Sequence, residues 1–325
     1  MSRARTWLIV FRWGIFLLAC AYIWSQLASA KGNQSVQALW ALLKAPPMRV
    51  VISAVFILML LNWWVEAIKW RLLLKPFTSI GHVRAFIATI AGTSVALISP
   101  NRTGEFVGRV MFLDPDRRIK GAVATMLGGI AQFIATLLAG AVALLFISRT
   151  HNWDGGFIGP MLGALAFLTI ACAIVAIVFY SNTVLLSRVI LAFPFLERWR
   201  SDVFVLDMYS RPILRNVLLL AFLRYAIFTS QFVLLIVMLD RDLAISDALL
   251  GVPVIFLVST LIPTVLLTEL GVRGSVALAV LVPVGAVESH LLLATFTIWA
   301  INLMLPALAG SLILLAARIR TRSAK

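Results

Sequence analysis

The chain has 325 residues, of which 62% are hydrophobic and 13% are charged, and its mean hydropathy is +1.03. Soluble domains contain roughly 45–50% apolar and about 25% charged residues, so this composition excludes a soluble domain and indicates a protein of the bilayer. The 28 Lys and Arg outnumber the 13 Asp and Glu, which gives a net charge of +15. In a membrane protein such an excess first reports topology, so we expect no nucleic-acid partner.

Six apolar stretches are long enough to cross a membrane as helices, which takes about 20 residues each. They cover residues 7–27, 50–68, 121–148, 157–180, 213–239 and 291–316. The first begins among arginines and has no clean cleavage pattern behind it, so we expect a retained anchor and not a signal peptide. An even number of crossings places both termini on the same side of the membrane.

Two further apolar regions, 84–112 and 247–284, are too long for one span and are interrupted by Pro100 and Pro263. Proline removes a helical hydrogen bond and clashes with the preceding turn, so it breaks a helix. We therefore predict a broken or re-entrant helical hairpin in each region. Whether these hairpins re-enter or cross fully, the side on which the termini lie does not change.

The basic residues predict which loops face the cytoplasm. With the N-terminus inside, 19 of the 28 Lys and Arg, Lys69 among them, fall on the cytoplasmic side and five fall outside. This asymmetry agrees with the positive-inside rule and predicts an N-in/C-in topology. Four arginines lie in apolar surroundings and are not explained by topology: Arg102, Arg109, Arg224 and Arg273.

The two broken regions share one pattern, in which a proline and a short polar break precede Glu-x-x-x-Arg. The first pair is Glu105 and Arg109, and the second, 164 residues later, is Glu269 and Arg273. Three crossings separate the two pairs, and an odd number inverts the second half relative to the first. The sequence thus predicts an all-α polytopic membrane domain over 1–325, with inverted halves 1–150 and 151–325 whose hairpins meet near the bilayer centre, as in many transporters.

The paired charges leave two interpretations open. An ionisable group at the bilayer centre costs roughly 2.5–3.5 kcal/mol on insertion scales, but an i, i+4 spacing lets Glu and Arg pair on one helix face. Each pair is then either an ionic clasp that braces its hairpin or part of a polar cavity. The repetition of the pair beside Arg102 favours the cavity.

A net positive charge at this centre indicates an anionic ligand. Three arginines face two glutamates there, so a lipid phosphate would balance the charge. We expect the arginines to bind that phosphate, the glutamates to balance and orient the arginines, and three further residues to line the cavity. The phosphate-binding residues are Arg102, Arg109 and Arg273, the orienting residues Glu105 and Glu269, and the lining residues Asn101, Glu66 and Arg224.

Two segments resemble elements of a known family. The run Ser99–Arg109 resembles the "PGRxGE…R" element, and Leu270–Arg273 the "GGLGVRE" element, of the lysylphosphatidylglycerol synthase transmembrane-region family. The similarity follows nearly the whole chain in span order, although Asn101 and Glu269 stand where the family has glycine. That family contains flippase-like membrane proteins, including the membrane half of aminoacyl-phospholipid synthases. Because we find no soluble aminoacyltransferase domain, the resemblance implies lipid translocation without synthesis.

We therefore predict a flippase or transporter that moves an anionic lipid, either a phospholipid or a polyprenyl-phosphate-linked lipid, across the bacterial inner membrane without cofactor or metal. The expected partners are anionic head groups and lipid-biosynthetic enzymes. One alternative is an integral-membrane transferase that uses Asp114 and Asp116 on a lipid-linked substrate. The longest cytoplasmic stretch, about 181–212, argues against it because it is short. The other alternative is a lipid-binding scaffold that transports nothing.

Residues 187–211 are predicted to form an interfacial helix on the cytoplasmic leaflet.

Overall fold

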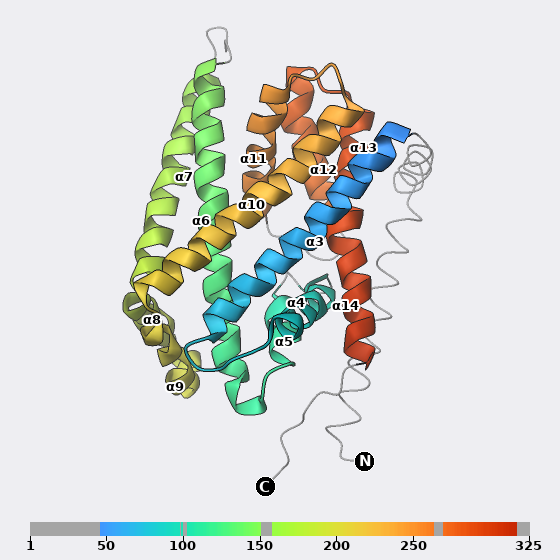
Figure 1. Ribbon diagram of the computed structural model, residues 1–325. Helices are drawn as coiled ribbons and strands as arrows, with labels where there is room; N and C mark the ends of the chain where they lie inside the picture. Colours follow the sequence, from blue (N-terminus) through green and yellow to red (C-terminus); the bar gives the residue numbers. More distant parts are fainter. Residues whose placement is uncertain (1–45, 98, 100–102, 151–157, 263–268, 317–325) are drawn as a thin grey trace.

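The computed structural model describes residues 46–97, 99, 103–150, 158–262 and 269–316, shown as coloured ribbons in Figure 1. Within these ranges every regular element is a helix. The helices that make up the long apolar segments are α3 (Pro46–Leu74) and α6 (Arg118–Thr150) in residues 1–150, and α7 (Ile158–Ser181), α10 (Arg211–Leu239), α13 (Glu288–Trp299) and α14 (Leu305–Ala316) in residues 151–325. A π-helical turn, η6 (Ala300–Met304), joins α13 to α14 into one continuous helical rod.

Five helical segments are long and apolar enough to cross a membrane: Pro46–Leu74, Pro115–Arg149, Gly159–Ser181, Arg211–Leu239 and Glu288–Ala316. They coincide with five of the six spans that the sequence predicts. The remaining predicted span, residues 7–27, lies outside the described residues. The described part of the chain is therefore that of a multi-pass integral membrane protein.

Each predicted hairpin is a pair of short helices. The first consists of α4 (His82–Leu97) and α5 (Gly104–Val110), and the second of α11 (Ile245–Leu261) and α12 (Glu269–Leu281). The seven residues of α5 rise by about 10 Å, which is a third of a hydrocarbon core of about 30 Å. By itself, α5 is therefore too short to cross a bilayer.

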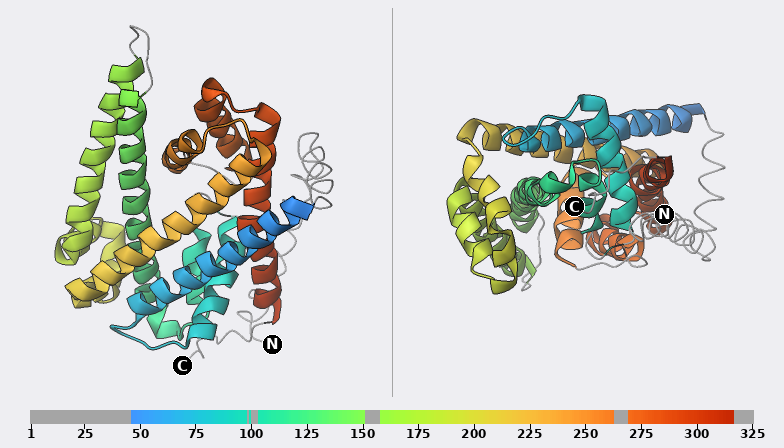
Figure 2. Two further views of the ribbon diagram at one scale, coloured as in Figure 1. Left: turned by 45° about the horizontal axis from the view of Figure 1, so that its top comes forward. Right: turned by 90° about the horizontal axis from the view of Figure 1, so that it is seen from below.

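The two hairpins lie toward opposite ends of the molecule. In Figure 1, α4 and α5 lie in the lower part, whereas α11 and α12 lie in the upper part. The long helices α3 and α10 pack against each other and run diagonally between these ends. Figure 2 shows α6 and α7 on one side of the molecule and α14 on the other. This arrangement leaves the middle of the molecule lined by helices from both halves.

The helices differ in how much of their surface is covered by protein. Only 17% of the apolar window of α7 is buried, against 61% for the continuous rod Glu288–Ala316. The large apolar side chains that α7 leaves uncovered include Phe167 and Leu168. Exposed apolar side chains on a membrane helix contact lipid, so α7 is a peripheral helix and the α13–α14 rod a central one.

Residues 187–211 do not form the single interfacial helix that the sequence predicts. They belong instead to four short helical segments, α8 (Thr183–Leu191), η3 (Pro194–Trp199), α9 (Arg200–Val203) and η4 (Phe204–Met208). Pro194 opens a new turn, because proline fits the first turn of a helix and not its interior. Within this connector, Val203 and Leu206 are buried.

A tyrosine fastens the end of this connector to α3. The Tyr209 hydroxyl donates a 2.6 Å hydrogen bond to the carbonyl oxygen of Leu73, one of the last carbonyls of α3, which lack helical partners. Burial, with a smaller contribution from Tyr180, raises the pKa of Tyr209 above its ordinary value. The hydroxyl therefore keeps its proton and remains a donor across the physiological pH range.

Glycines allow the helices around the first hairpin to approach closely. A Cβ added at Gly108 of α5 would lie 2.7 Å from the Cα of Gly92 in α4. A Cβ at Gly310 of α14 would overlap the carbonyl oxygen of Ile90 and come within 3.2 Å of the Cα of Ala91. Small residues at such crossings bring backbones together, which is how membrane helices pack in the absence of a hydrophobic driving force between them.

Replacing Gly310 with leucine is expected to destabilise the protein by about 1–3 kcal/mol, the usual range for overpacking, because the backbone of α4 cannot move out of the way of the new side chain. The same replacement at Gly163, where a Cβ would meet no atom within 4 Å, is the matched control. Thermal unfolding in detergent measures both. Equal melting temperatures for the two variants would contradict the close packing of α4 and α14.

Candidate functional site

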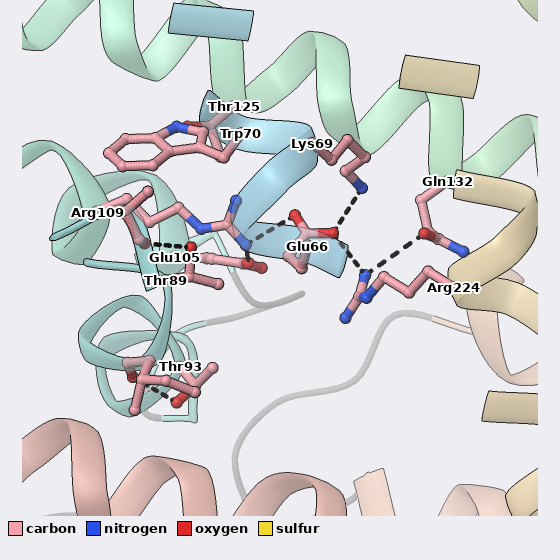
Figure 3. Close-up of polar contacts among 12 residues, drawn as sticks. Glu66, Lys69, Trp70, Thr89, Thr93, Glu105, Arg109, Thr125, Gln132 and Arg224 are labelled. Atoms are coloured by element: carbon pink, nitrogen blue, oxygen red, sulfur yellow. Dashed lines mark hydrogen bonds and ion pairs between the residues drawn. The ribbon is translucent and has the colours of Figure 1, made fainter. Parts of the chain in front are cut away.

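A buried ion cluster joins three helices around Glu66 of α3. Its carboxylate oxygens lie 2.6 Å from Lys69 Nζ on the same helix, 2.9 Å from Arg109 Nη2 on α5 and 3.2 Å from Arg224 Nη1 on α10 (Figure 3). The Glu66 side chain is 6% exposed. One carboxylate therefore pairs with basic groups from both halves of the chain.

Arg109 of α5 has carboxylates on two sides. It pairs with Glu66 and, one helical turn away, with Glu105, and its side chain is 2% exposed. Its guanidinium carbon also lies 6.0 Å from the ring centroid of Trp70, whose Nε1 donates to Thr125 of α6. Arg109 therefore braces the first hairpin against α3 and α6, and it does not line the cavity described next.

A cavity of about 330 Å³ adjoins the ion cluster. Residues of α3, α6, α10, α11, α12 and the π turn surround it, so both halves contribute. Its polar lining consists of amides and hydroxyls, from Asn62, Gln132, Thr136, Ser259, Thr260 and Asn302. Its aromatic lining consists of Trp63, Tyr225, Phe228 and Phe256. Such a mixture of apolar walls and a few polar groups is typical of small-molecule sites.

The second hairpin supplies the charges on one wall of the cavity. Arg273 and Glu269, one turn apart on α12, pair at 3.2 Å between Nη2 and Oε1. The guanidinium carbon of Arg273 lies 5.7 Å from the ring centroid of Phe228 and 5.9 Å from that of Phe256. An arginine within about 6 Å of an aromatic face is held by a cation–π attraction. Arg273 is thus oriented by a carboxylate and two rings at the cavity wall.

Arg224 connects the cavity to the ion cluster. Its Nε donates to Asn62 Oδ1 at 2.9 Å and its Nη1 to Gln132 Oε1 at 3.5 Å, while the same guanidinium pairs with Glu66. The guanidinium carbon lies 5.3 Å from the ring centroid of Trp63. Because Arg224 also lines the cavity, a charge placed there interacts directly with a member of the buried cluster.

The structure separates residues that the sequence grouped together. Arg273, Glu269 and Arg224 line the cavity, whereas Arg109 and Glu105 join Glu66 in the ion cluster. The two identical Glu-x-x-x-Arg pairs therefore have different surroundings. The predictions for Arg102 and Asn101 lie outside the described residues.

Lys69, which the sequence groups with the cytoplasmic basic residues, is not at an aqueous surface. Its side chain is 2% exposed and paired with Glu66. The signal was present, since Glu66 and Lys69 lie at i, i+3 within an apolar span, where such spacing lets charges pair. Trp63, Gln132 and Asn302 of the cavity lining carried no comparable signal, because isolated polar or aromatic residues are common in spans.

The aspartates considered for a transferase lie at the surface. Asp114 occupies the position before the short helix η2 (Pro115–Arg117), and the side chain of Asp116 is 69% exposed and lies 3.9 Å from Arg117. Over the described residues, no group of three or more His, Cys, Asp or Glu is arranged to hold a metal ion. Nothing about this pair favours a donor-substrate site over a solvated loop.

The helices and the charged cavity define a multi-pass integral membrane protein with a polar site inside an apolar bundle. Residues 7–310 match the family described as the lysylphosphatidylglycerol synthase TM region, and the chain belongs to this family. The match confirms the resemblance carried by Ser99–Arg109 and Leu270–Arg273 and connects the protein with the biology of membrane lipids. No curated protein and no solved structure matches the chain.

Proposed function

We propose that the protein is a flippase that moves an anionic lipid across the bacterial inner membrane with the lipid head group in the cavity. The observation that carries this proposal is the presence of two arginines, Arg224 and Arg273, on the wall of a cavity inside an apolar bundle. Arginine binds phosphate through a planar fork of donors and keeps its charge in buried surroundings. Glu269 orients Arg273, and Glu66 orients Arg224.

The residues of the first hairpin have a different part in this proposal from the one the sequence suggested. Because Arg109 is buried between two carboxylates, we assign it to holding the hairpin and not to contacting the phosphate. Glu105 completes that clasp. Arg102 keeps its predicted role as a further phosphate ligand, and Asn101 its predicted place in the cavity lining.

The size of the cavity favours a head group over a whole lipid. At about 330 Å³ it lies at the lower end of the roughly 300–1,000 Å³ found for small-molecule sites. A diacyl lipid exceeds this volume several times over because of its chains. We therefore propose that the head group passes through the cavity while the acyl chains remain in the surrounding lipid.

The proposal includes the inverted-repeat topology. Halves 1–150 and 151–325 would have opposite orientations, with both termini cytoplasmic, and the α4–α5 and α11–α12 hairpins would open the cavity alternately to the two leaflets. The repeated Glu-x-x-x-Arg and the location of the hairpins toward opposite ends of the molecule support it. We also retain lipid-biosynthetic enzymes as proposed partners, since such enzymes would supply or consume the transported lipid.

Reconstitution of the purified protein into liposomes tests the proposed function. Fluorescent anionic phospholipids and a fluorescent polyprenyl-phosphate lipid are placed in both leaflets, and dithionite bleaching of the outer leaflet reports movement. We expect at least one of them to move faster than in protein-free liposomes. Binding without movement would indicate the scaffold alternative, and a change in the mass of a lipid would indicate the transferase. Either result would contradict the flippase.

A further inference from the structure

Several residues that line the cavity carry a buried polar atom with no hydrogen-bond partner among the residues that the structure describes, and three of these atoms carry the argument. They are the indole Nε1 of Trp63, the hydroxyl of Ser259 and the amide oxygen Oδ1 of Asn302. Trp63 and Asn302 are each 2% exposed. Buried polar groups are nearly always hydrogen-bonded, so unpartnered groups on residues that line a cavity are expected to meet water or a ligand.

These atoms differ in the partner that each needs. The indole N–H only donates, the amide oxygen only accepts, and a serine hydroxyl does both. The orientation of the Asn302 amide is fixed because its Nδ2 donates to the carbonyl oxygen of Ile298 at 3.3 Å. The amide oxygen is therefore left to accept a hydrogen bond from a ligand. A ligand that satisfies all three must therefore both donate and accept hydrogen bonds.

The π turn explains how Asn302 comes to the cavity wall. Pro306 in the first turn of α14 would clash with the carbonyl of the residue four positions earlier, which is Asn302, if the rod were a regular α-helix. The π-helical turn Ala300–Met304 relieves this clash by widening the helix. Such turns are frequent at functional sites because they change the direction in which side chains point.

The charges beside the cavity set the charge of the ligand. Among the described groups, the positive charges of Lys69, Arg109, Arg224 and Arg273 face the negative charges of Glu66, Glu105 and Glu269. This set leaves a positive excess, and Arg102, a further phosphate ligand in the proposed function, would add to it, so the ligand is expected to be an anion. A phosphate group that links a lipid to a hydroxyl-bearing head group is a phosphodiester and carries a negative charge.

We infer that the head group in this cavity is a phosphodiester that also bears free hydroxyl groups, as a glycerol or cyclic polyol head group does. This inference rests on the proposed function and narrows its substrate class. The phosphate binds Arg224 and Arg273, while the hydroxyls donate to Asn302 Oδ1 and accept from Trp63 Nε1. An ammonium head group cannot accept from the indole, and the two arginines repel it. A phosphodiester with a methyl group in place of the polyol has no hydroxyl, so it leaves all three polar atoms without a hydroxyl partner.

The test compares lipids that differ only in the head group. Fluorescent phosphatidylglycerol and phosphatidylmethanol carry the same single charge, but the latter has no hydroxyl; phosphatidylethanolamine supplies the ammonium. In liposomes containing the protein, phosphatidylglycerol is expected to move about tenfold faster than either of the others. Phosphatidylmethanol loses the hydrogen bonds of the hydroxyls, and the ammonium of phosphatidylethanolamine cannot accept from Trp63 and is repelled by the two arginines. Equal rates for phosphatidylglycerol and phosphatidylmethanol would overturn the inference.

Replacement of Asn302 by leucine, which is similar in size, is expected to lower the rate for phosphatidylglycerol to that of phosphatidylmethanol and to leave the latter unchanged. A variant in which Ser259 is replaced by alanine tests the same preference if the leucine variant does not fold. If the Asn302→Leu and Ser259→Ala variants both keep the full preference for phosphatidylglycerol, these side chains do not recognise the head group.

A binding measurement separates this inference from the flippase proposal. Native mass spectrometry of the detergent-solubilised protein with short-chain phosphatidylglycerol, short-chain phosphatidylmethanol and free glycerophosphoglycerol gives relative affinities without any movement of lipid. Preferential binding of phosphatidylglycerol without transport would support the head-group chemistry and contradict the flippase. If free glycerophosphoglycerol binds as well as phosphatidylglycerol or better, the head-group chemistry is again supported and the flippase contradicted, because the ligand is then a soluble molecule. Equal binding of the two lipids, or no binding of either, would overturn the inference.

Discussion

Replacing Arg273 with alanine is expected to slow lipid movement in reconstituted liposomes by about tenfold or more. The side chain lies on the cavity wall, where Glu269 and two aromatic rings orient it. A hydrogen bond to a charged group contributes about 1.5–3 kcal/mol, and each 1.4 kcal/mol corresponds to a factor of ten. The rate of dithionite-sensitive fluorescence loss after reconstitution measures the effect.

Two further variants separate loss of the phosphate contact from a general loss of charge or of fold. Arg273→Lys keeps the charge without the planar fork, so we expect a rate between those of the wild type and the alanine variant. Arg241→Ala removes an exposed arginine from the segment between α10 and α11 and should leave the rate unchanged. Wild-type rates in a folded Arg273→Ala protein would exclude this arginine from the substrate path.

Replacing Glu66 with alanine is expected to lower the free energy of unfolding by about 3–5 kcal/mol, the cost of breaking a buried ion pair by removing one partner. The change leaves Lys69 and Arg224 buried without the carboxylate that neutralises them, and it leaves Arg109 with Glu105 alone. We expect a poorly accumulating protein with a strongly reduced melting temperature in detergent.

The control for this prediction is an ion pair of the same i, i+3 spacing at the surface. Glu197 and Arg200 lie 3.0 Å apart with side chains 60% and 56% exposed, and Glu197→Ala should change stability by less than about 1 kcal/mol. Joint replacement of Glu66 and Lys69 by methionine should recover part of the loss, because it removes a buried charge of each sign. Equal melting temperatures for Glu66→Ala and Glu197→Ala would show that the cluster does not hold the helices together.

Together, these results would distinguish the two parts of the site. The ion cluster around Glu66 fixes the first hairpin against α3, and the cavity presents the charged pair of the second hairpin. Arg224 belongs to both, since it pairs with Glu66 and lines the cavity. A bound anion at Arg224 competes with Glu66 for the same guanidinium, which gives the cavity a direct electrostatic connection to the first hairpin.

The sequence by itself determined the class of protein, five of the spans and the family. Five predicted spans coincide with described helices, because the length of an apolar stretch reports directly whether a segment partitions into lipid. Helices α4 and α11 end at Leu97 and Leu261, just before Pro100 and Pro263, because the residue before a proline disfavours helical geometry. The short motifs Ser99–Arg109 and Leu270–Arg273, which begin at or shortly after those breaks, identified the family correctly.

Only the tertiary structure decided which charges share a site. The two Glu-x-x-x-Arg pairs read alike, but Arg109 is buried because Glu66 on another helix reaches it, while Arg273 remains on the cavity wall. Arg224 meets Asn62 across 162 positions of sequence. Hydropathy and spacing report how one segment divides between water and lipid, whereas the partner of a buried charge depends on how distant helices cross, and no local pattern records that crossing.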